Sequence, residues 1–327
     1  MKKTLLLLLC LIVFSSCATT ASPTYAIKSD YLLGTLVSVK IYDFGETDKS
    51  VIDDCFSIIK KYEQIFSYND PNSELSALNK AAFNNHVKVS DELFDIVFKS
   101  LSYCKKTNGA FDIGLGKLIE IWDKATILET PPDFKDISDF IGFKAFEHIV
   151  ISEIDKTVMY TDERVSIHLG ACAKGYLEDI ALLFLKEKGV KSAILDFGGS
   201  ITALGDKTGE PFHIGISDPV NDNELVGEIM ISDKSVVTSG DYRRYFMYEE
   251  IKYHHILDSN TAYPASSDIN GVSVICDSAF IGDCLSTASY VLGSEKGIEL
   301  LLSEECGYVI VDKNSVKYDG VVFIDEG

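Results

Sequence analysis

FHIGIS at residues 212–217, GEIMI at 227–231 and SVVT at 235–238 are the stretches that decide the fold. Each is short and rich in β-branched residues, which favours a strand, and turn-forming residues separate the three. No helical pattern lies between them, so they are expected to pair antiparallel. Similar patterns predict strands at residues 31–42, 192–196, 245–248, 272–276, 307–311 and 320–324.

Helical periodicity is found at residues 50–66, 90–105, 173–188 and 279–292, and Asn72 or Ser73 can cap a further helix. Strands and helices do not alternate strictly, which argues against a doubly wound parallel sheet. The sequence instead predicts an α+β fold, with an antiparallel or mixed β-sheet core and packed helices. We expect one domain over residues 30–327.

The N-terminal segment has the pattern of a bacterial export signal. Two lysines precede an apolar run that is too short to span a membrane permanently. The run ends in Phe14-Ser15-Ser16-Cys17, which resembles a lipobox with Cys17 as the lipidated residue; an ordinary cleaved signal is the alternative. Residues 1–17 are therefore expected to be a signal peptide and residues 18–29 a tether. The protein is then expected in the periplasm, anchored to the inner membrane by lipid.

Composition restricts the partners. The formal net charge is −20, which repels nucleic acid, so a nucleic-acid partner is not expected. An acidic protein that binds a phosphorylated ligand needs a cation or local backbone dipoles. The chain has eight cysteines and no CxxC spacing, so buried free thiols are favoured over a thiolate metal site.

Two blocks have the residue types of a cation and phosphate site. Asp283 and Thr287 are four residues apart, which places their oxygens on one face of a helix, where they can share Mg²⁺. The alternative for Asp283 is a capping role near a helix start. The small residues of GACAKG at 170–175 allow close backbone approach, and Lys174 can offset phosphate charge; simple helix-entry packing is the alternative.

Three other blocks are suited to a nucleotide. Gly199 and Ser200 follow a buried strand, and their amides can bind a diphosphate or the edge of a flavin, although a plain Gly-Gly turn explains them too. Of His254 and His255, one ring is expected to point inward and the other toward a substrate. Asp112 can accept hydrogen bonds from a ribose or an isoalloxazine ring.

The order and spacing of these blocks resemble the ApbE family of FAD:protein FMN transferases. The resemblance runs from residue 33 to residue 293 and includes SELSALN at 73–79, GAFD at 109–112, LGACAKG at 169–175, TSGDY at 238–242 and HHILD at 254–258. It implies a T-fold-like domain and a magnesium enzyme that moves FMN from FAD to a threonine of client flavoproteins. Typical clients are subunits of sodium- or ferredoxin-linked respiratory complexes and fumarate reductase-like proteins.

The resemblance also implies residue roles. The carbonyl of Ala171, with Asp283 and Thr287, would hold the metal. The implied FAD contacts are Leu33, Asn69, Ala110, Phe111, Asp112, His168, Lys174 and Ile256. A client hydroxyl would attack the flavin-side phosphorus and AMP would leave, with Asp283 or His255 as the proton acceptor. Water as nucleophile would hydrolyse FAD to FMN and AMP, and a lipoprotein that binds FAD without turnover is the alternative of another class.

Three positions depart from the family pattern. His168 replaces the usual aspartate, and Asn69 stands where many relatives have a tyrosine. Loss of a stacking aromatic predicts weaker FAD retention and easier water entry, and therefore hydrolase activity, unless Tyr68 takes that place. Ala262 replaces a glycine, which costs little unless its φ is positive.

Overall fold

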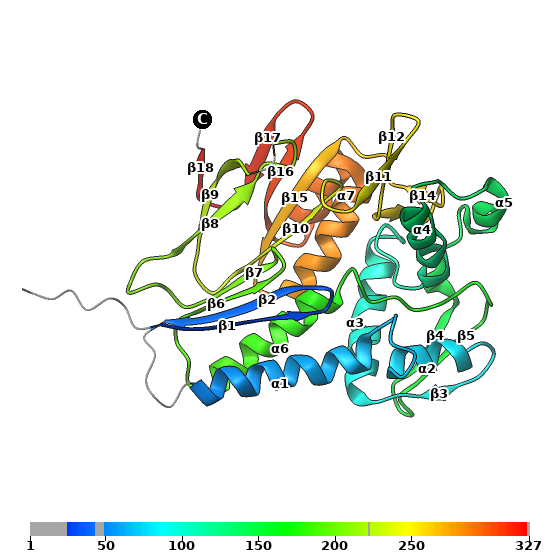
Figure 1. The fold of residues 1–327 in the computed structure, drawn as a ribbon, viewed down its shortest axis with the longest axis horizontal. Coiled ribbons are helices and arrows are strands. Elements are labelled where there is room, and N and C mark those ends of the chain that lie inside the picture. The colour runs from blue at the N-terminus through cyan, green and yellow to red at the C-terminus, as the bar shows by residue number, and fades with distance from the viewer. Residues whose placement is uncertain (1–24, 43–48, 222, 326–327) are drawn as a thin grey trace, which may run out of the picture.

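An eight-stranded sheet forms the centre of the computed structural model, which describes residues 25–42, 49–221 and 223–325 (Figure 1). In sheet order the strands are β1 (Tyr25–Leu32), β2 (Thr35–Tyr42), β6 (Ala193–Phe197), β7 (Ile201–Leu204), β10 (Ser235–Gly240), β15 (Ile269–Cys276), β16 (Gly307–Asp312) and β17 (Val316–Asp319). Each neighbouring pair is antiparallel. The predicted α+β class with an antiparallel core is confirmed.

The two faces of this sheet are covered differently. Helices α1 (Lys49–Phe66), α6 (Ala173–Glu187) and α7 (Ala279–Ser303) pack on one face, and a small sheet of β8 (Phe212–Ser217), β9 (Leu225–Ile231) and β18 (Phe323–Asp325) covers part of the other. Alternation along the strands explains this. Val274 of β15 joins an apolar cluster with α7, whereas its neighbour Ile275 packs with the small sheet.

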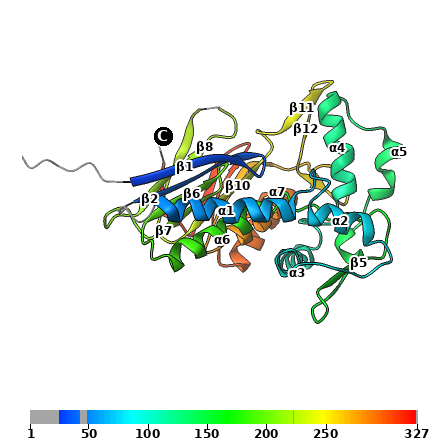
Figure 2. The ribbon, with the colours of Figure 1, turned by 60° about the horizontal axis from the view of Figure 1, so that its bottom comes forward.

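The chain between α1 and α6 builds the end of the molecule beside the sheet (Figure 2). Its elements are α2 (Glu74–Ala81), β3 (Val87–Lys88), α3 (Asp91–Lys106), α4 (Gly116–Leu128), α5 (Phe134–Ile137), β4 (Ile149–Ser152) and β5 (Thr157–Tyr160). Two short hairpins lie next to it: β11 (Tyr245–Tyr248) with β12 (Ile251–His254), and β13 (Leu257–Asp258) with β14 (Tyr263–Pro264). Ser73 caps α2 by accepting the amide of Ser76 at 3.0 Å, as predicted.

The N-terminal boundaries differ from prediction. The strand predicted at residues 31–42 is a hairpin, because Leu33 (φ 56°) and Gly34 (φ 71°) both have left-handed backbone and turn the chain between β1 and β2. Residues 25–29 belong to β1, so the tether predicted at 18–29 is wrong over that part. The predicted signal peptide and Cys17 lie outside the described residues.

Two C-terminal elements also differ. The strand predicted at residues 320–324 starts only at β18, because Gly320 (φ 68°) turns the chain after β17. Helix α7 runs beyond the predicted end at residue 292, but Gly293 (φ 80°) interrupts it there. Six cysteines in the described ranges are buried and free, which confirms the expectation for them. Within those ranges no helix combines the length and apolar character that crossing a membrane requires.

Candidate active site

A cavity of about 590 Å³ lies where the helical end of the molecule meets the sheet. Its size is that of a typical small-molecule site. It is lined by nearly all of the residues predicted for the site: Leu33, Asn69, Ala110, Phe111, Asp112, His168, Ala171, Lys174, Gly199, His255, Ile256, Asp283 and Thr287. Segments that are far apart in the sequence therefore converge on one space, as the family resemblance implies.

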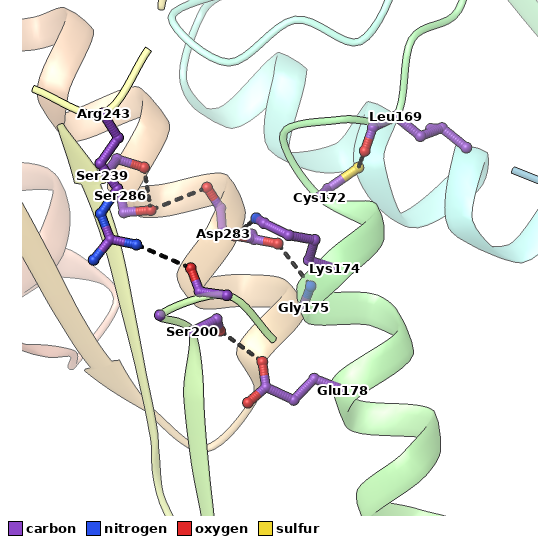
Figure 3. A network of polar contacts seen from close by, with 12 residues as sticks. Leu169, Cys172, Lys174, Gly175, Glu178, Ser200, Ser239, Arg243, Asp283 and Ser286 are labelled. Atoms are coloured by element: carbon purple, nitrogen blue, oxygen red, sulfur yellow. Dashed lines mark hydrogen bonds and ion pairs between the residues drawn. The ribbon is translucent and has the colours of Figure 1, made fainter. Parts of the chain in front are cut away.

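Asp283 lies at the closest approach of α6 and α7 (Figure 3). Its Oδ2 accepts the backbone N–H of Gly175 at 2.7 Å, and its Oδ1 is 3.3 Å from Lys174 Nζ. In a continuing helix the Gly175 amide would donate to the carbonyl of Ala171, four residues earlier. That amide is directed to Asp283 instead, and no described residue donates to the Ala171 carbonyl. The carboxylate and the free carbonyl thus lie at the same helix start.

Gly175 sets the distance between the two helices. A Cβ atom there would lie 2.2 Å from the carbonyl oxygen of Ala279, so only glycine fits. Asp179, one turn further along α6, accepts the amides of Ala279 at 2.8 Å and Phe280 at 3.2 Å and so fixes the start of α7. Thr287 lies one turn of α7 beyond Asp283 and lines the same cavity.

The donor set of this corner suits a hard cation. Asp283, Thr287 and Ala171 offer a carboxylate, a hydroxyl and a carbonyl, and Mg²⁺ prefers such oxygens while taking its other ligands from phosphate and water. The described part of the chain contains no group of three or more His, Cys, Asp and Glu side chains that could hold a metal alone. A cation here would therefore need a ligand's phosphate oxygens to complete its shell.

The two adjacent histidines have different surroundings. His254 is buried; its Nδ1 accepts the amide of Ile256 at 3.3 Å, and its Nε2 donates to the carbonyl of Ala265 at 3.0 Å. His255 opens to the cavity, and its Nδ1 donates to the carbonyl of Arg244 at 3.3 Å, so Nε2 keeps its lone pair. Surrounding protein atoms, and then the charge of Arg244, lower the pKa of His255 to about 4. The expected inward and outward rings are confirmed.

His168 and Asn69, the two positions expected to depart from the family pattern, both line the cavity. Nδ1 of His168 accepts the amide of Gly170 at 3.2 Å, and burial lowers the pKa of this histidine to about 4, so its Nε2 carries the proton and is a donor. Tyr68 packs against this ring, with centroids 4.7 Å apart, and its hydroxyl donates to Glu120 at 2.7 Å. Tyr68 is thus held at His168 and itself lines the cavity, beside the exposed Asn69.

Several predicted ligand contacts have structural roles. Phe111 is 1% exposed and fills the core, although it reaches the cavity wall. Asp112 accepts the amides of Gly114 at 2.8 Å and Phe146 at 3.2 Å, and burial raises its pKa to about 6. Ala262, which is not one of the predicted ligand contacts, has a positive φ of 60°, a backbone conformation that costs energy for any residue with a Cβ atom.

The Gly198–Ser200 turn does not present the predicted amides. The Gly199 amide donates to Asp196 at 2.9 Å, so it is spent within the turn. Ser200 is buried, does not line the cavity, and donates its hydroxyl to Glu178 Oε2 at 2.6 Å (Figure 3). The prediction of Ser200 as a ligand contact is therefore not supported, because the tight turn directs its side chain inward.

Sequence reasoning missed three charged residues. Arg243 and Arg244 both line the cavity. Glu178 is fully buried, its Oε1 has no hydrogen-bond partner within the described residues, and burial raises its pKa to about 8. A signal for Glu178 was present, because a carboxylate stands between Leu177 and Ala181 on the buried stripe of α6.

Comparison with known proteins places this geometry in a family. The family model described as "ApbE family" matches residues 33–310. A protein of Klebsiella pneumoniae named FAD:protein FMN transferase is 31% identical over 288 residues, 88% of this chain and 89% of its own length. One of the same name from Treponema pallidum is 30% identical over 291 residues, 84% and 80% of the two chains.

A solved structure agrees with the sequence comparison. The ApbE protein of Thermotoga maritima superposes with a TM-score of 0.82 at 28% identity, covering 91% of this chain and 97% of that one. The matched segment includes the residues that line the cavity and both helices that meet at Asp283. The chain therefore belongs to the ApbE family.

Proposed function

We propose that this protein is an FAD:protein FMN transferase that acts with Mg²⁺, moves FMN from FAD to a threonine hydroxyl of a client flavoprotein and releases AMP. The name of the two relatives described above supports the activity. The observation that carries the proposal is the convergence of the Ala171 carbonyl, Asp283 and Thr287 on one cavity of suitable size. Residues 1–17 are proposed to be the signal peptide that exports the protein to the periplasm, where a lipid on Cys17 would anchor it to the inner membrane.

The chain's own groups account for the remaining chemistry. Bound at this corner, Mg²⁺ would neutralise charge on the FAD diphosphate. Lys174 lies 3.3 Å from Asp283 and offsets its charge, so the carboxylate is held at the metal corner, the position proposed for Mg²⁺ between Ala171, Asp283 and Thr287. His255 is the better proton acceptor for the attacking hydroxyl, because its Nε2 lone pair is free. Both oxygens of Asp283 already have partners.

Hydrolysis of FAD to FMN and AMP is a second reaction that the cavity supports. Tyr68 lines the cavity, but it is fixed against His168 and Glu120 and so is not free to move into the place of an aromatic at position 69. Water therefore has a more open route to the diphosphate than in a site closed by a stacked ring. Client and water would compete at the same metal corner.

One incubation separates these reactions. The protein is mixed with FAD, Mg²⁺ and a client domain, and AMP, free FMN and protein-bound flavin are quantified. Transfer gives bound flavin and AMP; hydrolysis gives free FMN and AMP. A client in which the acceptor threonine is replaced by valine should accept no flavin. Tight FAD binding with no AMP would refute both reactions and favour a flavin-binding protein.

A further inference from the structure

We propose that Arg243 and Arg244 are the phosphate-binding residues of this cavity and make it select phosphorylated flavins over riboflavin. The inference rests on the proposed function and adds to it the residues that recognise the ligand's anionic groups. Its basis is the placement, in the cavity of an acidic protein, of two cations that have no ion-pair partner among the described residues.

The arginines of this chain are few and unevenly placed. The sequence has three, against 50 acidic residues. Arg164 is paired with Asp162 at 2.7 Å. Arg243 and Arg244 form no ion pair within the described part of the chain, although both line the cavity. Asp123, which also lines the cavity, feels the charge of Arg244 but forms no ion pair with it among the described residues. Because carboxylates are abundant on this surface, two adjacent guanidinium groups without an ion pair there indicate a site for an external anion.

The third cation of the cavity is already neutralised. Lys174 Nζ lies 3.3 Å from Asp283 Oδ1, and that carboxylate is 4% exposed. Lys174 therefore offsets a charge of the protein itself. The diphosphate of FAD brings further negative charge into the cavity, and Arg243 and Arg244 are the cationic side chains left to meet it.

Arg243 is held over the Gly198–Ser200 turn. Its Nη1 donates to the Gly198 carbonyl at 3.2 Å, and Figure 3 shows it reaching toward this turn. A Cβ at Gly199 would lie 2.9 Å from Nη1, so the guanidinium packs directly against the backbone of this glycine. A guanidinium has five N–H donors in a plane, and one bond to Gly198 leaves the others for phosphate oxygens. The amide of Gly199 is already spent on Asp196, so at this turn the donor that faces the ligand is Arg243.

Arg244 serves a different part of the same wall. Its positive charge acts on His168 and on His255, and its carbonyl accepts the His255 Nδ1–H. Arg243 is thus held at the glycine turn, and the charge of Arg244 is felt at the two histidines. Two guanidinium groups in one cavity can serve a ligand that carries two phosphate groups.

The test compares ligands that differ only by phosphate. Flavin fluorescence is used to measure the dissociation constants of FMN and riboflavin for the wild-type protein, Arg243→Gln, Arg244→Gln and the double variant. The control is Lys313→Gln, which removes the same charge from the β16–β17 turn, outside the cavity. AMP and adenosine, followed by calorimetry, form a second pair for the adenosine-side phosphate.

The expected result is a selective loss. Because a charge-assisted hydrogen bond is lost, the double variant should lower the preference for FMN over riboflavin by roughly 10-fold or more, while riboflavin affinity stays unchanged. Arg243→Lys should retain part of the preference, because it keeps the charge but not the planar fork. Lys313→Gln should behave as wild type. Circular dichroism confirms folding of each variant.

An unchanged FMN-to-riboflavin preference in the double variant would overturn the inference. If that variant also transfers less flavin to the client, the arginines would be assigned to client docking instead. Either result leaves the proposed function intact if the wild-type protein still forms protein-bound flavin, whereas a wild-type protein that forms neither bound flavin nor AMP refutes the function itself.

Discussion

Replacing Glu178 with glutamine should remove a pH-dependent loss of stability. Glu178 is fully buried on α6, and one of its oxygens has no partner in the described structure. Burial raises its pKa from the ordinary 4.5 to about 8. Glutamine has nearly the same shape, and its carbonyl can still accept the Ser200 hydroxyl that now donates to Oε2 at 2.6 Å.

The sign follows from proton binding. Between pH 4.5 and about 8 the folded state retains a proton on Glu178 that the unfolded chain releases. The free energy of unfolding therefore falls as pH rises through this range. A tenfold change in proton affinity corresponds to about 1.4 kcal/mol, so at about pH 8 Glu178 should have lowered the free energy of unfolding by on the order of 4 kcal/mol.

Urea unfolding of wild type and Glu178→Gln at several pH values from about 5 to about 8.5 measures this difference. The variant should be close to wild type at the acidic end and more stable at the basic end. Glu187→Gln, at the exposed end of the same helix, is the control and should follow wild type throughout. A stability difference that stays constant with pH would show that Glu178 does not titrate in this range and refute the reasoning.

Four further outcomes are expected. Asp283→Asn should lower AMP release roughly 100-fold or more, because the metal corner loses its charged ligand; near-normal turnover at ordinary Mg²⁺ would contradict this. His255→Gln should lower kcat by roughly 100-fold with FAD affinity kept, and should abolish the fall in activity that the wild type shows as pH drops toward 4, where the base becomes protonated. Asn69→Tyr should tighten FAD binding by about 5- to 100-fold and reduce the share of free FMN among the products, measured by chromatography; an unchanged share would exclude Asn69 as the water route. Ala262→Gly should change the free energy of unfolding by no more than about 1 kcal/mol, because relief of the positive φ is offset by the loss of a buried methyl group; a loss above about 2 kcal/mol would be incompatible with this balance.

The sequence predicted those parts of the fold that depend on local patterns. Period-two runs such as β8 and amphipathic helices such as α1 lie within a residue of the expected bounds. The β1–β2 hairpin was read as one strand, because Leu33 occupies a left-handed turn position without being one of the residue types that signal it. Helix α4 was missed, since it begins at Gly116 and has no side-chain N-cap.

The residues of the candidate site could likewise be predicted where a local motif contains them, and not where the folded structure decides their surroundings. Asp283, Thr287 and His255 could be selected from the sequence because they stand in recognisable motifs, and the structure brings them to one cavity. Ser200 was misassigned, because the direction of a side chain beyond a glycine turn depends on backbone angles that composition does not reveal. Arg243 stood next to a recognised motif, but its lack of a carboxylate partner is a property of the folded surface and is not encoded in neighbouring residues.

The missing side chain at Gly175 has a consequence for how such a protein can diverge. The position of Asp283 next to the start of α6, where the Ala171 turn ends, is fixed where two helix backbones touch. Residues around the opening, such as His168 and Asn69, can therefore be exchanged without moving the reacting corner. Under the proposed function, substitutions there could change ligand preference, and the balance between client and water as acceptors, without moving Asp283.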